Sequence, residues 1–230
     1  MEDIINNVKK EVELLLNTDR SGHGMEHIER VLNLSYSLSK NMEANKLIIS
    51  LIALLHDVDD YKIFGMENAK NLSNANRILN KYITDEDIKD VILTSISQIG
   101  YSKRLEGIKP QYLEGMIVSD ADMLDAMGAC GLTRSIAYAL SKGRKVFDPN
   151  IFPSLDLDAN GYRKENDTTM INHVFEKLLK LKDLMLTDKA KKEALIRHEF
   201  MVEFLNEYFE ELNLTDWQIY LEKYLGVLHK

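Results

Sequence analysis

Residues 51–60 read LIALLHDVDD, and this stretch decides both the fold and the candidate site. Apolar residues run almost unbroken from Leu47 to Leu55, after which the chain becomes polar. A helix that is hydrophobic on nearly every face is usually buried. The end of such a helix places an imidazole, His56, and a carboxylate, Asp57, at the edge of a core. Groups of this kind are destabilising in a core unless a partner satisfies them.

Two kinds of partner suit the pair His56 and Asp57. A divalent metal accepts a neutral imidazole and a carboxylate together. A hydrogen bond between the two side chains at a helix end would also satisfy them. If the helix continues through the pair, the two side chains diverge by about 100°, so one metal must lie between their directions. Asp60 would then share their side of the helix.

The composition favours one helical domain over residues 1–230. Hydrophobic residues make up 45% of the chain and charged residues 29%, and only three prolines and 11 glycines interrupt it. Apolar residues recur at helical spacing and no period-two strand pattern occurs. The predicted fold is all-α, with Thr84 and Asp87 as an N-terminal cap signal and a long loop at about 142–168. The predicted helices cover residues 4–16, 25–40, 45–58, 67–82, 84–99, 112–127, 132–141, 170–186, 188–212 and 215–225.

The charge excludes some classes of partner. Acidic residues outnumber basic ones by 37 to 29, which gives a formal net charge of −8 and argues against general nucleic-acid binding. The N-terminal residues MEDIINN are too polar for a signal peptide. The longest apolar run is about half of the roughly 20 residues that span a bilayer. We therefore expect a cytoplasmic protein without a membrane segment, in which Cys130, the only cysteine, is a buried small residue.

Two further segments offer groups that suit a metal. His27 lies on the predicted helix 25–40, whereas His23, between Gly22 and Gly24, is expected in the loop that enters it. A histidine on a helix is more often structural, but this one closely precedes a buried His-Asp pair.

The second segment, residues 118–129, reads VSDADMLDAMGA. On a helix, Asp120 and Asp122 point in nearly opposite directions, whereas Asp122 and Asp125 share a face. Buried carboxylates need a metal or a cation network. Alternatively, Asp120 is a helix cap.

Five segments together resemble the HD superfamily of metal-dependent phosphohydrolases. They span about residues 21–205 and are similar to a subgroup that includes bacterial hydrolases acting on (deoxy)nucleoside triphosphates. The resemblance implies an all-α HD-domain helical bundle. The segments are GHGMEHIERV (22–31), LLHDVDDYKIFG (54–65), DADMLDAMGACGLTR (120–134), INHVFEKLLKLKDLM (171–185) and RHEFMVEFL (197–205).

The resemblance also implies roles for individual residues. The metal ligands would be His27, His56, Asp57 and Asp122, with Asp120 a less favoured fourth ligand. Asp60, three residues after the His-Asp pair, matches the catalytic carboxylate of related nucleotidases, with Asp59 and His23 as alternatives. One divalent ion is expected, and Mn, Mg, Co, Ni, Fe and Zn all suit this ligand set. Such an ion lowers the pKa of bound water from about 15.7 towards about 7.

The reaction implied is hydrolysis of a (deoxy)nucleoside triphosphate to the monophosphate and pyrophosphate. The alternatives are an HD nucleoside monophosphatase or phosphodiesterase, and a catalytically silent nucleotide-binding regulator. A polyphosphate needs a local group of cations in an acidic protein. Lys62 and Lys177 lie in the matching segments, whereas Arg144, Lys145, Arg163 and Lys164 are candidates by position and charge in the long loop. Tyr61, Tyr101 and Phe147 are candidates for stacking on a base.

Overall fold

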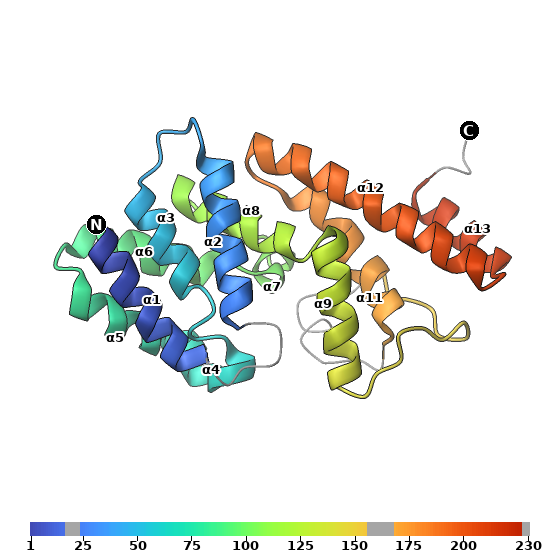
Figure 1. Ribbon diagram of the computed structural model, residues 1–230, viewed down its shortest axis with the longest axis horizontal. Helices are drawn as coiled ribbons and strands as arrows, with labels where there is room; N and C mark the ends of the chain where they lie inside the picture. Colours follow the sequence, from blue (N-terminus) through green and yellow to red (C-terminus); the bar gives the residue numbers. More distant parts are fainter. Residues whose placement is uncertain (17–23, 156–167, 227–230) are drawn as a thin grey trace.

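The chain folds into helices, as the sequence predicts (Figure 1). A computed structural model describes residues 1–16, 24–155 and 168–226, and within these ranges every regular element is helical. The helices are α1 (Glu2–Leu16), α2 (Met25–Ser39), α3 (Lys46–Leu55), α4 (Tyr61–Asn71), α5 (Ser73–Tyr82), α6 (Glu86–Gln98), α7 (Tyr101–Leu105), α8 (Leu113–Asp125), α9 (Gly128–Ser141), α11 (Met170–Glu176), the 3₁₀ helix η1 (Leu178–Leu184), α12 (Asp188–Glu211) and α13 (Thr215–Tyr224).

Helix α3 is the buried centre of the N-terminal part. Every residue from Ile48 to Leu55 is buried, and α3 packs against α1, α2, α6 and α8. Its first turn is held by the Asn45 side chain, which accepts hydrogen bonds from the backbone N–H groups of the second and third helical residues. The burial expected from the apolar run is confirmed, and it fixes where the polar residues after Leu55 emerge.

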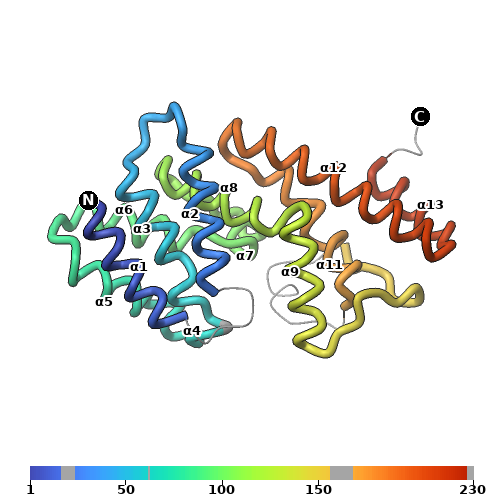
Figure 2. The backbone as a smooth tube through the Cα atoms, in the orientation of Figure 1, coloured from blue at the N-terminus to red at the C-terminus, as the bar shows by residue number. Residues whose placement is uncertain are grey.

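Helix α8 connects two groups of helices. In Figure 1, α1–α6 lie on one side of it and α9–α13 on the other, and the tube in Figure 2 shows α1 and α13 at opposite ends of the molecule. Helix α8 packs against α2, α3 and α6 in the first group and against α9 and α12 in the second. One hydrophobic core runs from Val8 on α1 to Leu221 on α13. A side chain on α8 can therefore reach residues from both halves of the chain.

Asp59 breaks the helix predicted for residues 67–82 into α4 and α5. Leu72 between them has a left-handed backbone, with φ of 47°. The Asp59 carboxylate accepts hydrogen bonds from the backbone N–H groups of Asn74 and Ala75, both at 2.9 Å. Asp59 thus caps the N-terminus of α5 from outside the helix. The break depends on a tertiary contact that helical periodicity does not reveal.

Other differences are local. The helix predicted for residues 170–186 divides at Lys177, where φ is −132°, and continues as η1. Asp85 rather than Thr84 caps α6, because the Asp85 side chain accepts from the backbone N–H groups of Asp87 and Ile88. Cys130 is exposed rather than buried, because it lies on a solvent-facing part of α9. The short helix α7 was not predicted. In the described ranges no helix combines the length and apolar character that crossing a bilayer requires.

Candidate metal centre and its pocket

Four side chains from three helical segments converge on one point. His27 comes from α2, Asp122 from α8, and His56 and Asp57 from the turn that follows α3. The His27 Nε2 atom lies 3.2 Å from His56 Nε2. It also lies 3.4 Å from Asp57 Oδ2 and 3.4 Å from Asp122 Oδ1. Ligand atoms of His27, His56 and Asp57 all fall within 4.8 Å of one another.

Two adjacent candidate ligands stand at the end of α3. The helix ends at Leu55, and His56 is its C-cap, with helical backbone angles of φ −64° and ψ −27°. The side chains of His56 and Asp57 therefore still leave the chain in different directions, and a metal must lie between them. Their tips nevertheless approach each other and Asp122, because His56 Nε2 is 3.6 Å from Asp57 Oδ2 and 3.9 Å from Asp122 Oδ1.

These separations suit a divalent metal. Ligand bonds of about 2.1 Å at right or tetrahedral angles place ligand atoms about 3.0–3.4 Å apart. Five separations among the four donor atoms measure 3.2–3.9 Å, and the three that involve His27, at 3.2–3.4 Å, fall within this range. Two imidazole nitrogens and two carboxylate oxygens form a donor set that borderline transition metals accept. The residues present therefore fit a metal ion.

Hydrogen bonds at the opposite ring nitrogens orient both histidines. His27 Nδ1 lies 2.7 Å from Asp125 Oδ2, and His56 Nδ1 lies 2.9 Å from the carbonyl oxygen of Ala53. Each Nδ1 donates its hydrogen to an oxygen, so the Nε2 atoms carry the lone pairs that a metal binds. Metal-binding histidines commonly make this second contact, which fixes the ring orientation.

The carboxylates around this centre favour a positively charged group between them. Burial lowers the pKa of His27, but hydrogen bonds to Asp122, Asp125 and Asp57 raise it from 6.5 to about 10. Burial raises the pKa of Asp125, yet hydrogen bonds from His27 and Arg30 hold it well below its usual range. A divalent cation supplies the same positive charge and leaves the imidazole neutral, as ligation requires.

Asp120 and Asp59, both considered in the sequence, belong to the scaffold. Asp120 points away from the centre and accepts hydrogen bonds from the backbone N–H groups of Leu186, at 2.9 Å, and Thr187, at 2.7 Å. These contacts lie at the N-terminus of α12. Asp120 is therefore not a cap of its own helix, as one interpretation of the sequence proposed, but ties α8 to the segment that leads into α12. Asp59 caps α5.

A pocket of about 430 Å³ opens over the metal centre. His27, His56, Asp57 and Asp122 all line it, and so does the candidate catalytic residue Asp60. Two aromatic side chains, Tyr61 and Tyr101, also contribute to its wall. Among the side chains that the structure describes, four cationic ones line the same pocket: Lys70, Lys103, Arg134 and Lys177.

The structure separates the cationic residues proposed from the sequence. Lys177 lies in the pocket, with its Nζ atom 5.3 Å from the centre of the Tyr101 ring. Lys145 forms an ion pair with Asp148 at 2.7 Å, and the guanidinium of Arg144 lies 6.0 Å from the Tyr138 ring centre. Neither of these two lines the pocket.

The remaining candidates fall elsewhere. Phe147 packs 5.0 Å from the ring of Trp217 in an aromatic cluster, which excludes it from base stacking in this pocket. The structure describes the backbone of Lys62 in α4 but not its side chain. His23, Arg163 and Lys164 lie outside the described residues.

Sequence reasoning missed three of the four pocket cations. Lys70 and Lys103 stand in segments without a recognised motif, and Lys103 lies on the unpredicted helix α7. Arg134 ends the segment DADMLDAMGACGLTR, so its position in a matching segment was a signal that could have identified it.

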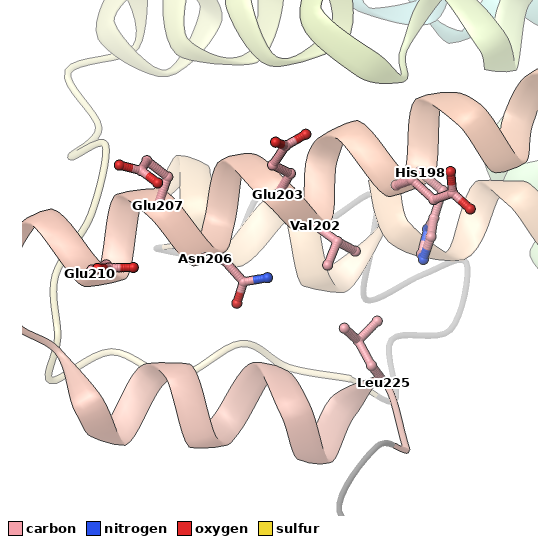
Figure 3. A pocket seen from close by; sticks show the side chains of 8 residues that line it. His198, Val202, Glu203, Asn206, Glu207, Glu210 and Leu225 are labelled. Atoms are coloured by element: carbon pink, nitrogen blue, oxygen red, sulfur yellow. The ribbon is translucent and has the colours of Figure 1, made fainter.

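A second pocket of similar size has the opposite charge. It measures about 470 Å³ and lies between α12 and the end of α13 (Figure 3). Val202 and Asn206 point from α12 towards Leu225, whereas Glu203 and Glu207 project from the other side of that helix. Four glutamates line this pocket: Glu199, Glu203, Glu207 and Glu210. Such a lining disfavours an anionic ligand.

Comparisons with known proteins agree with this geometry. The family model described as "HD domain" matches residues 24–127, a range that contains all four candidate metal ligands. A solved structure from Lactobacillus plantarum is 36% identical, with a TM-score of 0.81, and the match covers 93% of this chain and 98% of that one.

Two Bacillus proteins are also similar over most of their length. An HD-superfamily hydrolase from Bacillus thuringiensis is 35% identical, with a TM-score of 0.70 and coverage of 92% of this chain and 98% of the other. Bacillus subtilis YpgQ, solved in complex with ADP, is 25% identical, with a TM-score of 0.69 and coverage of 91% and 95%. The family match, the near full-length similarity and the converging His and Asp side chains lead to one conclusion: the chain belongs to the HD superfamily of metal-dependent phosphohydrolases.

Proposed function

We propose that this protein hydrolyses (deoxy)nucleoside triphosphates to the nucleoside monophosphate and pyrophosphate. The observation that carries the proposal is that one pocket combines the candidate metal ligands with four cationic side chains, in a protein of net charge −8. Cations gathered in one cleft of an acidic protein attract a multiply charged anion. The pocket volume of about 430 Å³ is in the range of small-ligand sites.

The relatives support a nucleotide as the substrate. YpgQ of Bacillus subtilis binds ADP in its solved structure, and its fold matches over 91% of this chain. A nucleotide needs an apolar or aromatic surface for the base beside a cationic surface for the phosphates. Tyr61 and Tyr101 offer such surfaces in the pocket, whereas Phe147 does not line it. We therefore assign base contact to one of the two tyrosines.

The metal would be held by His27, His56, Asp57 and Asp122. A divalent metal supplies Lewis-acid polarisation of a phosphoryl oxygen and favours ionisation of water at neutral pH. Asp60 lines the pocket beside these residues, where a carboxylate can accept the proton of the attacking water or donate one to the leaving oxygen. Asp59 is not available for this step because both of its oxygens cap α5.

Lys177 is suited to the phosphates remote from the attacked bond. Its position at the break between α11 and η1 directs it to the pocket. A contact with the Tyr101 ring restrains its ammonium group. Tyr101 is itself anchored, since its hydroxyl donates a hydrogen bond to the carbonyl oxygen of Glu176 at 3.4 Å. Binding of the two terminal phosphates here would make pyrophosphate the leaving group.

Substrate profiling tests the proposal. The purified protein is incubated with nucleoside mono-, di- and triphosphates and a cyclic dinucleotide, with each of Mn, Mg, Co, Ni, Fe and Zn, and with chelator. We expect pyrophosphate from triphosphates with at least one metal and none with chelator. Orthophosphate from monophosphates alone would assign the protein as a nucleoside monophosphatase, and cleavage of the cyclic dinucleotide alone as a phosphodiesterase. Nucleotide binding without hydrolysis under every condition would indicate a silent regulator.

A further inference from the structure

We propose that Arg134 binds a substrate phosphate next to the metal centre, and that Asp125 positions Arg134 and His27 together. This inference rests on the proposed function, because it assigns a phosphate contact within the same pocket. It adds a substrate-binding residue and a positioning residue to the ligand set described above. Asp125 is a positioning residue because it contacts a metal ligand and a pocket cation and does not itself line the pocket.

A single buried carboxylate joins three helices. Asp125 is 1% exposed and stands at the end of α8. Its Oδ2 atom accepts hydrogen bonds from His27 Nδ1 on α2, at 2.7 Å, and from Arg134 Nη1 on α9. The carbonyl oxygen of Asp125 is also a partner of Arg134 Nη1, at 3.5 Å. A shift of this carboxylate would therefore displace the His27 ring and the Arg134 guanidinium together.

Two arginines contact Asp125, but only one of them lines the pocket. Arg30 spans both carboxylate oxygens, with Nε at 2.6 Å from Oδ1 and Nη2 at 3.1 Å from Oδ2. Arg134, on α9, contacts Oδ2. Its side chain is 26% exposed and lines the pocket with His27 and Asp122. Asp125 is thus shared by two guanidinium groups and an imidazole, so Arg134 is one of three groups that contact it. Of the two guanidinium groups, that of Arg134 lines the pocket together with the candidate metal ligands.

The ligand that suits this position is a phosphate group. A planar guanidinium matches two phosphate oxygens, and a buried carboxylate behind it restricts its orientation before the substrate binds. The same pocket is also lined by Lys70, Lys103 and Lys177. A lysine offers one compact ammonium group in place of a planar fork. We assign to Arg134 the phosphate closest to the metal, and to Lys177 the phosphates further along.

Binding of phosphate compounds to the manganese-loaded protein tests the assignment without relying on turnover. Calorimetric titrations with ADP and with tripolyphosphate are compared for the wild type and for Arg134→Gln, Arg134→Lys and Arg77→Gln, at saturating manganese. We expect Arg134→Gln to weaken both ligands by on the order of 10–100-fold, with manganese affinity within about threefold. Arg134→Lys keeps the charge but loses the planar contact, and we expect about tenfold weaker binding.

Arg77→Gln is the matched control, because it removes an exposed guanidinium that pairs with Glu11 outside the pocket. We expect it to leave ADP affinity within about threefold at saturating manganese. Thermal unfolding establishes whether each variant is folded. If Arg134→Gln is not folded, Arg134→Lys alone provides the test. ADP and tripolyphosphate binding by Arg134→Gln and Arg134→Lys at wild-type affinity would overturn this inference alone. A wild-type protein that binds neither ligand would overturn both this inference and the proposed function.

A double-mutant cycle tests the positioning role of Asp125. Asp125→Asn should weaken manganese by about 10–100-fold, as loss of such an outer contact to a ligating histidine typically does, and should also weaken ADP at saturating manganese. In the Arg134→Gln background the same substitution should weaken ADP by no more than about twofold, because its route to the phosphate is already removed. A merely structural role for Asp125 would give independent, additive losses of ADP affinity, and that result would overturn the coupling.

Discussion

Asp125 Oδ2 lies 2.7 Å from His27 Nδ1, although 98 residues separate the two in sequence. One turn earlier on α8, Asp122 Oδ1 lies 3.4 Å from the other ring nitrogen, Nε2. Helix α8 thus supplies both a candidate metal ligand and the carboxylate that orients a second ligand. Because side chains three positions apart lie on one helix face, this arrangement depends on α8 remaining helical through Asp125.

Asp122→Asn should weaken manganese binding by at least about tenfold. The substitution removes a negative ligand from the centre while preserving the size of the side chain. Calorimetric titration of metal-free protein with manganese measures the effect. Asp188→Asn, at an exposed carboxylate that pairs with Lys191, is the control and should bind manganese as the wild type does. Unchanged manganese affinity in Asp122→Asn would remove Asp122 from the ligand set.

Asp60→Asn should lower kcat by about 10²–10⁴-fold, the usual contribution of a general acid or base. Metal content should stay near that of the wild type, because Asp60 is not one of the four converging ligands. Steady-state kinetics and metal analysis by mass spectrometry measure the two effects. Full activity in Asp60→Asn would assign proton transfer to another group.

The neighbouring carboxylate provides a contrast to Asp60. Asp59→Ala removes both hydrogen bonds to the start of α5 and should lower stability by about 2 kcal/mol. Its main effect should be on the thermal unfolding midpoint, whereas Asp60→Asn should leave that midpoint nearly unchanged. If folded Asp59→Ala lost as much kcat as Asp60→Asn, the assignment of a structural role to Asp59 and a catalytic role to Asp60 would be wrong.

Lys177→Ala should raise KM for triphosphates by about tenfold or more and should change KM for a simple aryl phosphate much less. The reason is that we assign the two terminal phosphates to Lys177, and an aryl phosphate has neither of them. Lys191→Ala removes an exposed lysine that pairs with Asp188, and it should leave both KM values unchanged. An equal rise in KM for both substrates would contradict the placement of the terminal phosphates at Lys177.

The unfolding stability should depend on pH through Glu11. Hydrogen bonds from Lys81, at 2.5 Å, and Tyr82, at 3.0 Å, lower the pKa of Glu11 from 4.5 to about 2. A carboxyl group whose pKa is lowered by folding stabilises the folded state above its ordinary pKa. That contribution is lost as the pH falls from about 4.5 towards 2. Because Lys81 is mostly exposed, solvent screens the ion pair and its contribution at neutral pH is small.

Glu11→Gln should therefore unfold at a lower temperature than the wild type at pH 7, and the difference should shrink as the pH is lowered from 5 to 3. Glu13→Gln, at an exposed position of the same helix, is the matched control and should show no such trend. Calorimetric unfolding midpoints across this pH range make the comparison. A difference between Glu11→Gln and the wild type that is constant with pH would contradict the lowered pKa.

The all-α fold was predictable because its main signals are local. The apolar run of α3 and the spacing of α2 and α8 determine which faces are buried, and the ligands stand on those faces. The breaks at Leu72 and Lys177 were not predictable in this way. At Leu72 the deciding contact comes from Asp59, which lies outside α4 and α5 and does not contribute to their helical periodicity.

The site was predictable to the extent that ligand type and motif identify it. The structure brings together His27, His56, Asp57 and Asp122, which the family resemblance selects as ligands. The pocket cations are different, because a lysine carries no periodic signal that separates a pocket from a solvated surface. Arg144 and Lys145 were proposed from their charge and their position in the long loop and do not line the pocket, whereas Lys103 and Arg134 do.

The most direct test of the proposed reaction is phosphorus NMR of a (deoxy)nucleoside triphosphate incubated with the protein and manganese. We expect the signals of pyrophosphate and of the nucleoside monophosphate to grow together in equal amounts. We also expect EDTA to abolish both signals, and Asp122→Asn to suppress them at limiting manganese. Intact triphosphate in the presence of folded wild-type protein with each of the six candidate metals would contradict the proposed reaction.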